Sequence, residues 1–249
     1  MTDVTTVIST VASVAEGEFR IGRVFSRTLS LLSRNFPIYF AVAAVAALPS
    51  VLLENSGGDN DAAVSPALLG LLTMLVLAPL SQAIMLHTAF QDMSGRRISL
   101  SESLRAALGR WLPLIGVSIC VGVGIMCGLI LLIVPGIIVM IMCYVANPAC
   151  IAERLGVFAS MARSSELTKG HRWSIFGMWV LIAIASGIMT AVVKAVLGLT
   201  GSTGLVISGT LAWTALAAAF GAVFAIVTYH DLRVAKEGID VRQLVAVFD

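Results

Sequence analysis

Residues 112–152 read LPLIGVSICVGVGIMCGLILLIVPGIIVMIMCYVANPACIA, an apolar run that contains no charged side chain. A helix needs about 20 residues to cross a bilayer, so this run is long enough for two crossings. Two further apolar blocks, at about 36–90 and 173–229, have the same capacity. The sequence therefore predicts six transmembrane helices arranged as three hairpins.

Basic residues gather in the segments between these blocks. The groups are Arg20, Arg23, Arg27 and Arg34; Arg96, Arg97, Arg105 and Arg110; Arg154, Arg163, Lys169 and Arg172; and Arg233, Lys236 and Arg242. Lys and Arg are enriched in the cytoplasmic loops of membrane proteins. Each hairpin is therefore predicted to leave and return to the cytoplasmic side, and both termini are predicted to lie there.

The composition excludes a soluble domain. Charged residues make up 12% of the chain and hydrophobic residues 58%, whereas soluble domains carry about 25% charged residues. We expect a cytoplasmic segment at 1–35, a six-span membrane domain at 36–229 and a cytoplasmic tail at 230–249. No removable signal peptide is expected, because residues 1–19 lack Lys, Arg and a clean apolar core.

A basic amphipathic surface helix is predicted before each hairpin, at about 21–34, 99–111 and 155–169. Ser99 and Glu102 form a capping box for the second helix, and Gly170 is a left-handed cap for the third. The predicted apolar faces are Ile21, Val24, Phe25, Thr28, Leu29 and Leu32; Leu100, Leu104, Leu108 and Trp111; and Phe158 and Met161. The fold class is thus an all-α integral membrane protein.

Two prolines interrupt the 112–152 run. Val134-Pro135-Gly136 is the predicted reversal, because Pro cannot continue a helix and Gly permits a turn. Pro148 follows Gly136 closely, so the second arm is short. Three arrangements fit it: a tilted span, a kinked span, or a re-entrant pair that does not fully cross.

Four cysteines lie symmetrically about Pro135. Cys127 and Cys143 would match in depth in a hairpin that closes there, as would Cys120 and Cys150. Thiolates suit Cu(I), so a soft-metal path or a redox-sensitive pair is one interpretation. The favoured interpretation is that they are small apolar packing residues, and no metal or cofactor is assigned.

Candidate binding residues fall into two sets, and no catalytic residue is predicted because acidic residues are missing from the centres of the predicted spans. The candidate lipid-contact residues are Arg23, Arg27, Arg34, Arg105, Arg110, Arg163, Lys169 and Arg172. Pro79 and Pro148 interrupt helical hydrogen bonding, which either close packing or a small polar cavity would accommodate. The candidate cavity residues are Thr73, Ser81, Gln82, Tyr144 and Asn147.

Short motifs between Gly116 and Gly177 follow a recurring pattern. They are Pro135-Gly136-Ile137, Ala146-Asn147-Pro148, Glu153, Ala162-Arg163-Ser164, Leu167-Thr168-Lys169-Gly170 and Arg172-Trp173. This pattern resembles the YciC-like bacterial inner-membrane proteins and the related membrane domain of glycerophosphoryl diester phosphodiesterases. The resemblance implies a six-span bundle of largely uncharacterised function. The catalytic barrel of the fused relatives is not expected in this chain, so no catalytic residue is carried over.

These observations predict a non-enzymatic, multi-pass protein of the bacterial inner membrane. It would act as a membrane-associated partner, assembly or protective factor, including immunity to a membrane-active toxin. The alternative is a small transporter or exporter subunit for a small solute or a soft metal. The expected partners are anionic lipid headgroups and a membrane protein or a second copy of the chain; the net charge of +2 does not point to nucleic acid.

Overall fold

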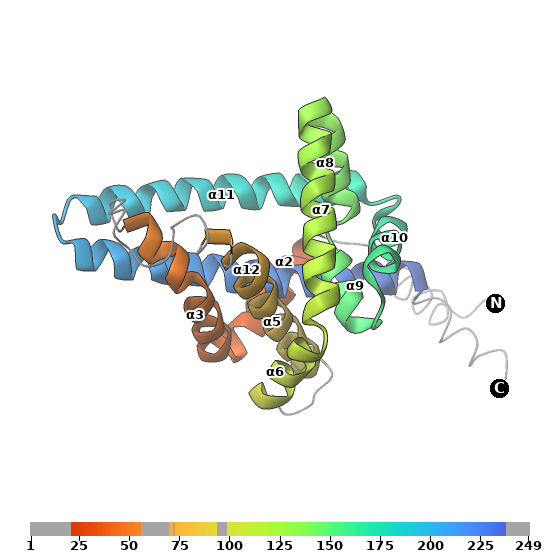
Figure 1. Cartoon of the computed structure of the whole chain (residues 1–249), viewed down its shortest axis with the longest axis horizontal. Helices are drawn as coiled ribbons and strands as arrows, with labels where there is room; N and C mark the ends of the chain where they lie inside the picture. The colour runs from red at the N-terminus through yellow and green to blue at the C-terminus, as the bar shows by residue number, and fades with distance from the viewer. Residues whose placement is uncertain (1–20, 56–69, 72, 94–98, 238–249) are drawn as a thin grey trace, which may run out of the picture.

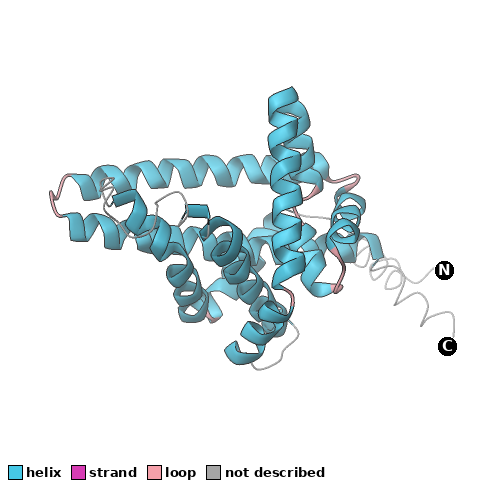
Figure 2. Cartoon of the chain, in the orientation of Figure 1, coloured by secondary structure: helices cyan, strands magenta, loops and turns pink. Residues whose placement is uncertain are grey.

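The computed structural model describes residues 21–55, 70–71, 73–93 and 99–237, and these residues form helices joined by short turns, with no β-strand among them (Figure 2). The elements are α2 (Ile21–Arg34), α3 (Phe36–Asn55), the π-helix η1 (Thr73–Leu77), α5 (Ala78–Met93), α6 (Leu100–Gly109), α7 (Trp111–Leu131), α8 (Ile133–Met142), α9 (Ala146–Ala152), α10 (Val157–Thr168), α11 (Arg172–Gly198) and α12 (Thr203–Glu237).

Among the described residues, five helical segments are long and apolar enough to cross a membrane. They are Phe36–Leu53, Trp111–Leu131, Ile133–Ala152, Arg172–Gly198 and Thr203–Glu237. The protein is therefore an all-α, membrane-embedded chain. The predicted second span begins at Pro66, outside the described residues; its described part, η1 and α5, is not among the five segments.

Helix α12 is the centre of the bundle. Its residues from Ala222 to Tyr229 are all buried, as are Asp231 and Leu232. Helices α2, α3, α5, α9, α10 and α11 all contact it. Burial on every side requires small residues where neighbours approach, and Ala215, Ala219 and Ala222 supply them. The helix continues to Glu237 without a break at residue 230.

The predicted first surface helix has the expected bounds, but it packs on another helix. The Phe25 ring lies against Phe224 of α12, with ring centroids 5.4 Å apart. Leu31, which was not predicted to face inward, is buried, whereas Leu29 is exposed. Leu29 lies four residues after Phe25 and Leu31 lies three residues after Thr28, so periodicity alone could not tell which of them would face α12.

The α7–α8 pair reverses earlier than predicted. Helix α7 ends at Leu131, and Leu132 has an extended backbone at φ −170° and ψ 147°. Pro135 therefore lies in the first turn of α8, where its missing N–H is not needed. Gly128 and Gly136 are in close contact: a Cβ on Gly128 would come within 2.7 Å of Gly136 backbone atoms.

The earlier reversal also changes the expected pairing of the cysteines. Gly124 of α7 faces Val139 of α8: a Cβ on Gly124 would lie 3.3 Å from the Val139 side chain. Four residues further from the reversal on each arm, the same register places Cys120 opposite Cys143. The predicted depth match of Cys127 with Cys143 is therefore wrong. All four cysteines are free thiols.

The second arm is kinked, which is one of the three predicted arrangements. Helix α8 ends at Met142, a turn follows, and α9 resumes at Ala146. In Figure 1 the α7–α8 pair runs across the long α11–α12 pair. The tip of α7–α8, from Ile130 to Val134, is exposed and entirely aliphatic.

Candidate functional site: a charged elbow and an apolar pocket

We call the region around the C-terminal end of α12 the elbow. It consists of α9, α10, residues 153–156 between them, and the last turns of α12 from Tyr229 (Figure 1). The chain enters the elbow through the kink between α8 and α9, at residues 143–145. Pro148 has no N–H to donate to the Tyr144 carbonyl, so regular helical bonding fails there.

Ser164 of α10 stabilises this kink. Its hydroxyl donates to the Met142 carbonyl at 2.7 Å and accepts from the Val145 N–H at 3.2 Å. The Ala146 N–H, which would reach Met142 in a regular helix, bonds Cys143 instead at 3.0 Å. Ser164 is fully buried. One side chain therefore satisfies two backbone groups that the kink would otherwise leave without partners.

An ion-paired cluster closes the elbow. The Glu153 Oε1 atom accepts from Arg163 Nε at 2.9 Å and from the Tyr229 hydroxyl at 2.7 Å. Arg163 also pairs with Glu166 at 3.4 Å and with Glu237 of α12. These contacts tie α10 to both the end of α9 and the end of α12.

The protonation of this cluster follows from its contacts. Burial alone would raise the pKa of Glu153, but hydrogen bonds from Tyr229 and Arg163 and the arginine charge outweigh it, so that the pKa is lowered. Burial acts against the charged form of Arg163 too, yet its carboxylate neighbours raise its pKa. Both groups are therefore charged at neutral pH, and Glu153 is not poised as a general acid.

The face that α10 buries is mixed in polarity. Ser160, Ser164, Leu167 and Thr168 are fully buried, whereas Phe158 is 79% exposed. Of the predicted apolar face, Met161 is half-buried and packs against an apolar core of the bundle, whereas Phe158 does not. Gly170 has the predicted left-handed conformation, with φ 93°.

The candidate lipid-contact residues have several different environments. Arg27 pairs with Asp231 at 2.8 Å, and Arg34 with Asp92 at 3.8 Å. Arg110 donates to the carbonyls of Cys150 at 3.3 Å and Leu155 at 3.2 Å. Arg105 and Lys169 are exposed, and the structure gives neither a partner among the described residues. Arg163 lies in the elbow cluster, while Arg23 and Arg172 are half-buried.

The candidate cavity residues come together only in part. Asn147 Nδ2 donates to Gln82 Oε1 at 3.0 Å, which joins α9 to α5, and the buried Asn147 Oδ1 atom has no hydrogen-bond partner. The Ser81 hydroxyl donates to the Ala78 carbonyl of its own helix at 2.9 Å. Thr73 is buried on η1, and Tyr144 packs against the main apolar core.

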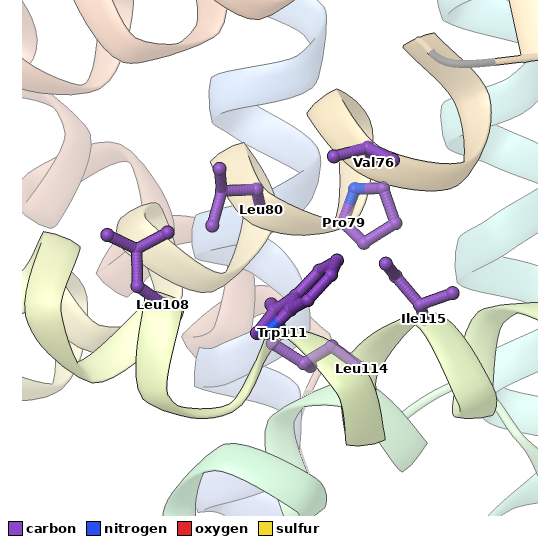
Figure 3. A pocket seen from close by; sticks show the side chains of 7 residues that line it. All are labelled: Val76, Pro79, Leu80, Leu108, Trp111, Leu114 and Ile115. Atoms are coloured by element: carbon purple, nitrogen blue, oxygen red, sulfur yellow. The ribbon is translucent and has the colours of Figure 1, made fainter.

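A pocket of about 290 Å³ lies beside Pro79, between η1–α5 and the α6–α7 junction (Figure 3). All its lining side chains are apolar: Val76, Pro79, Leu80, Leu108, Trp111, Leu114 and Ile115. The predicted cavity residues do not line it. Within the described part of the chain, no group of three or more His, Cys, Asp or Glu side chains could hold a metal ion.

Sequence reasoning did not find several partners that complete these contacts. Tyr229 and Glu237 reach the elbow from α12, and Asp231 and Asp92 pair with arginines of α2. These pairs join residues far apart in the sequence, so no local spacing could have revealed them. A weak signal was available for Asp231, because a carboxylate near the end of a long apolar helix usually has a charged partner.

The fold and its contacts define a class: a membrane-embedded helical bundle with an ion-paired elbow. In comparisons with known proteins, no family model, curated protein or solved structure matches the chain.

Proposed function

We propose that this chain is a non-enzymatic, multi-pass membrane protein that works by contact, as a partner, assembly or protective factor for another membrane protein. The observation that carries this proposal is that the ion-paired side chains of the elbow do not line the pocket at Pro79. The elbow carboxylate of Glu153 is occupied by Arg163 and Tyr229. The pocket at Pro79 is lined by apolar side chains only.

An enzyme needs a reactive group and a substrate cavity in one place. In this chain Arg163 of the elbow pairs with Glu153, Glu166 and Glu237 and so ties three helices together. Such a network supports a rigid scaffold rather than a reacting centre. The long exposed apolar faces, above all on α11 and at the α7–α8 tip, offer contact area to lipid or to a partner helix.

The proposal also states in which membrane the chain lies and to which family it is related. The chain would lie in the bacterial inner membrane with both termini in the cytoplasm, as the distribution of basic residues favours. It would belong with the YciC-like proteins. The motif residues support this relationship by having defined roles: Ser164 and Glu153 hold the elbow, and Gly170 ends α10.

The second candidate function is a small transporter or exporter subunit. One observation favours it: the Gln82–Asn147 pair joins the two helices that contain Pro79 and Pro148, and Asn147 Oδ1 lacks a partner. A polar group at this position in an apolar bundle is suited to line a path. Substituting both residues with Leu would abolish solute movement in reconstituted vesicles if that path exists.

Crosslinking in native membranes tests the first proposal. The tagged chain is crosslinked, purified, and analysed by mass spectrometry for proteins, lipids and metals together. An unrelated tagged six-span protein is the control for non-specific capture. A stoichiometric protein partner, absent from the control, is the expected result. A bound solute or copper without any protein partner would overturn the proposal in favour of transport.

A further inference from the structure

The pocket beside Pro79 is formed by two elements that approach from different sides. The η1–α5 segment supplies Val76, Pro79 and Leu80, and the α6–α7 junction supplies Leu108, Trp111, Leu114 and Ile115 (Figure 3). The π-helical turn of η1 ends at Leu77, two residues before Pro79. Irregular helical geometry of this kind leaves space that a continuous helix would fill.

An exposed apolar stripe runs along α6 and ends at this pocket. Leu100, Leu104, Leu108 and Trp111 each have roughly half of their surface exposed. They follow helical spacing along one face, and the last two also line the pocket. A half-exposed apolar stripe on an amphipathic helix is suited to lie at the boundary of acyl chains and headgroups. Tryptophan favours the same boundary.

Arg105 adds a charge beside the stripe. It lies one helical turn before Leu108, so it is on the same side of α6. Its side chain is exposed, and the structure gives it no partner among the described residues. Its neighbour Arg110 differs, because both carbonyls that it reaches belong to the protein.

We propose that the pocket binds one acyl chain of an anionic phospholipid, whose phosphate contacts Arg105. This inference rests on the membrane location given under the proposed function. A volume of about 290 Å³ is at the lower end of ligand pockets, which suits part of a hydrocarbon chain but not a polar headgroup. The lining favours an apolar ligand, because its one polar side-chain group is the Trp111 indole N–H and most polar atoms buried there would have no partner.

Fluorescence quenching tests this proposal in the full-length chain. Trp173, Trp179 and Trp213 are replaced with Phe, which leaves Trp111 as the reporter at the pocket. The protein in detergent is titrated with dioleoyl phosphatidylglycerol whose acyl chains are brominated, and in parallel with brominated dioleoyl phosphatidylcholine. The expected result is saturable quenching at one lipid per protein, with phosphatidylglycerol binding more tightly.

Two variants and two matched controls locate the site. Ile115→Phe fills the pocket and is expected to weaken both lipids at least tenfold, whereas Ile119→Phe, on the same helix but outside the lining, leaves binding unchanged. Arg105→Gln is expected to weaken phosphatidylglycerol about fivefold, since one basic residue contributes about 1 kcal/mol to anionic lipid binding. Lys194→Gln removes an exposed cation on α11, which is not among the candidate lipid-contact residues, and leaves the affinity for phosphatidylglycerol unchanged.

Quenching that never saturates, or that is the same in the Ile115→Phe and parent proteins, would overturn the proposal. So would an absence of quenching, as expected if a protein segment or a second copy fills the pocket. Loss of the phosphatidylglycerol preference only in Arg105→Gln supports it. Because crosslinked partner capture does not depend on this pocket, failure of the lipid site is distinguishable from failure of the proposed function.

Discussion

Replacing Ser164 with Ala should destabilise the protein far more than replacing Ser160, although both serines are buried on the same helix. Ser160 donates to the Gly156 carbonyl at 2.8 Å, and that carbonyl also accepts the Ser160 N–H. Its loss therefore leaves no backbone group without a partner. Loss of the Ser164 hydroxyl leaves two, the Met142 carbonyl and the Val145 N–H.

The magnitude follows from those two groups. A buried polar group without a hydrogen bond costs about 1–3 kcal/mol, so two cost about 2–6 kcal/mol. Relaxation of the turn lowers the observed value, and we expect about 2 kcal/mol for Ser164→Ala, which is roughly a 30-fold change in the folded-to-unfolded ratio. For Ser160→Ala we expect less than about 1 kcal/mol.

The assay is equilibrium unfolding in detergent, followed by the accessibility of an engineered label on α12. Hydrogen exchange at Val145 provides a local readout, because its N–H should lose protection in the Ser164 variant alone. Equal destabilisation by the two substitutions, or unchanged protection at Val145, would refute the conclusion that Ser164 holds the kink.

Three other substitutions give separate tests. The pKa of Glu153 is lowered in the folded protein, so its pairing stabilises the fold at pH values above about 4.3, the ordinary glutamate pKa, and this stabilisation is lost as the pH falls through the lowered pKa. Glu153→Gln should therefore flatten the acid limb of a curve of unfolding free energy against pH. An unchanged limb would mean that other carboxylates cause it. Arg27→Ala should cost about 1–3 kcal/mol in unfolding free energy, because Asp231 is only 6% exposed and would keep a charge whose remaining neighbour is the His230 ring at 3.7 Å; adding Asp231→Asn should recover part of that loss, and no recovery would contradict the pairing. Gly128→Ala should cost about 1–3 kcal/mol by forcing α7 and α8 apart, whereas Gly122→Ala, where a Cβ meets nothing within 4 Å, should not destabilise; thermal unfolding in detergent compares the two, and matching midpoints would argue against close contact at Gly128.

Local features of the fold were readable from the sequence because they depend on neighbouring residues. The bounds of the first surface helix, the Ser99 cap, whose oxygen accepts from the Glu102 N–H at 3.4 Å, and the Gly170 turn are confirmed. Each rests on a few consecutive residues and on rules of helix ends. The Glu102 half of the predicted capping box is wrong, because the Ser99 N–H donates to Gln91 Oε1 at 3.1 Å instead. The same rules placed the reversal of α7–α8 too late, because Pro is accepted in the first turn of a helix as readily as in a turn.

Features that depend on distant partners could not be read in this way. The basic residues were predicted to face lipid headgroups, and their positions gave no sign of the carboxylates that Arg27 and Arg163 meet on α12. The pocket was missed for a similar reason. Pro79 marked a disturbed helix, but whether polar or apolar side chains would surround it depended on how α6 and α7 pack there.

The central position of α12 has a consequence for how the chain is made. Ribosomes deliver the N-terminal part first, so α2, α3 and α5 are made before the helix on which they pack has been synthesised. Arg27 must wait for Asp231, which is translated 204 residues later. Assembly is therefore completed from the C-terminal end, and until α12 arrives the earlier helices lack the surface that covers their inward faces.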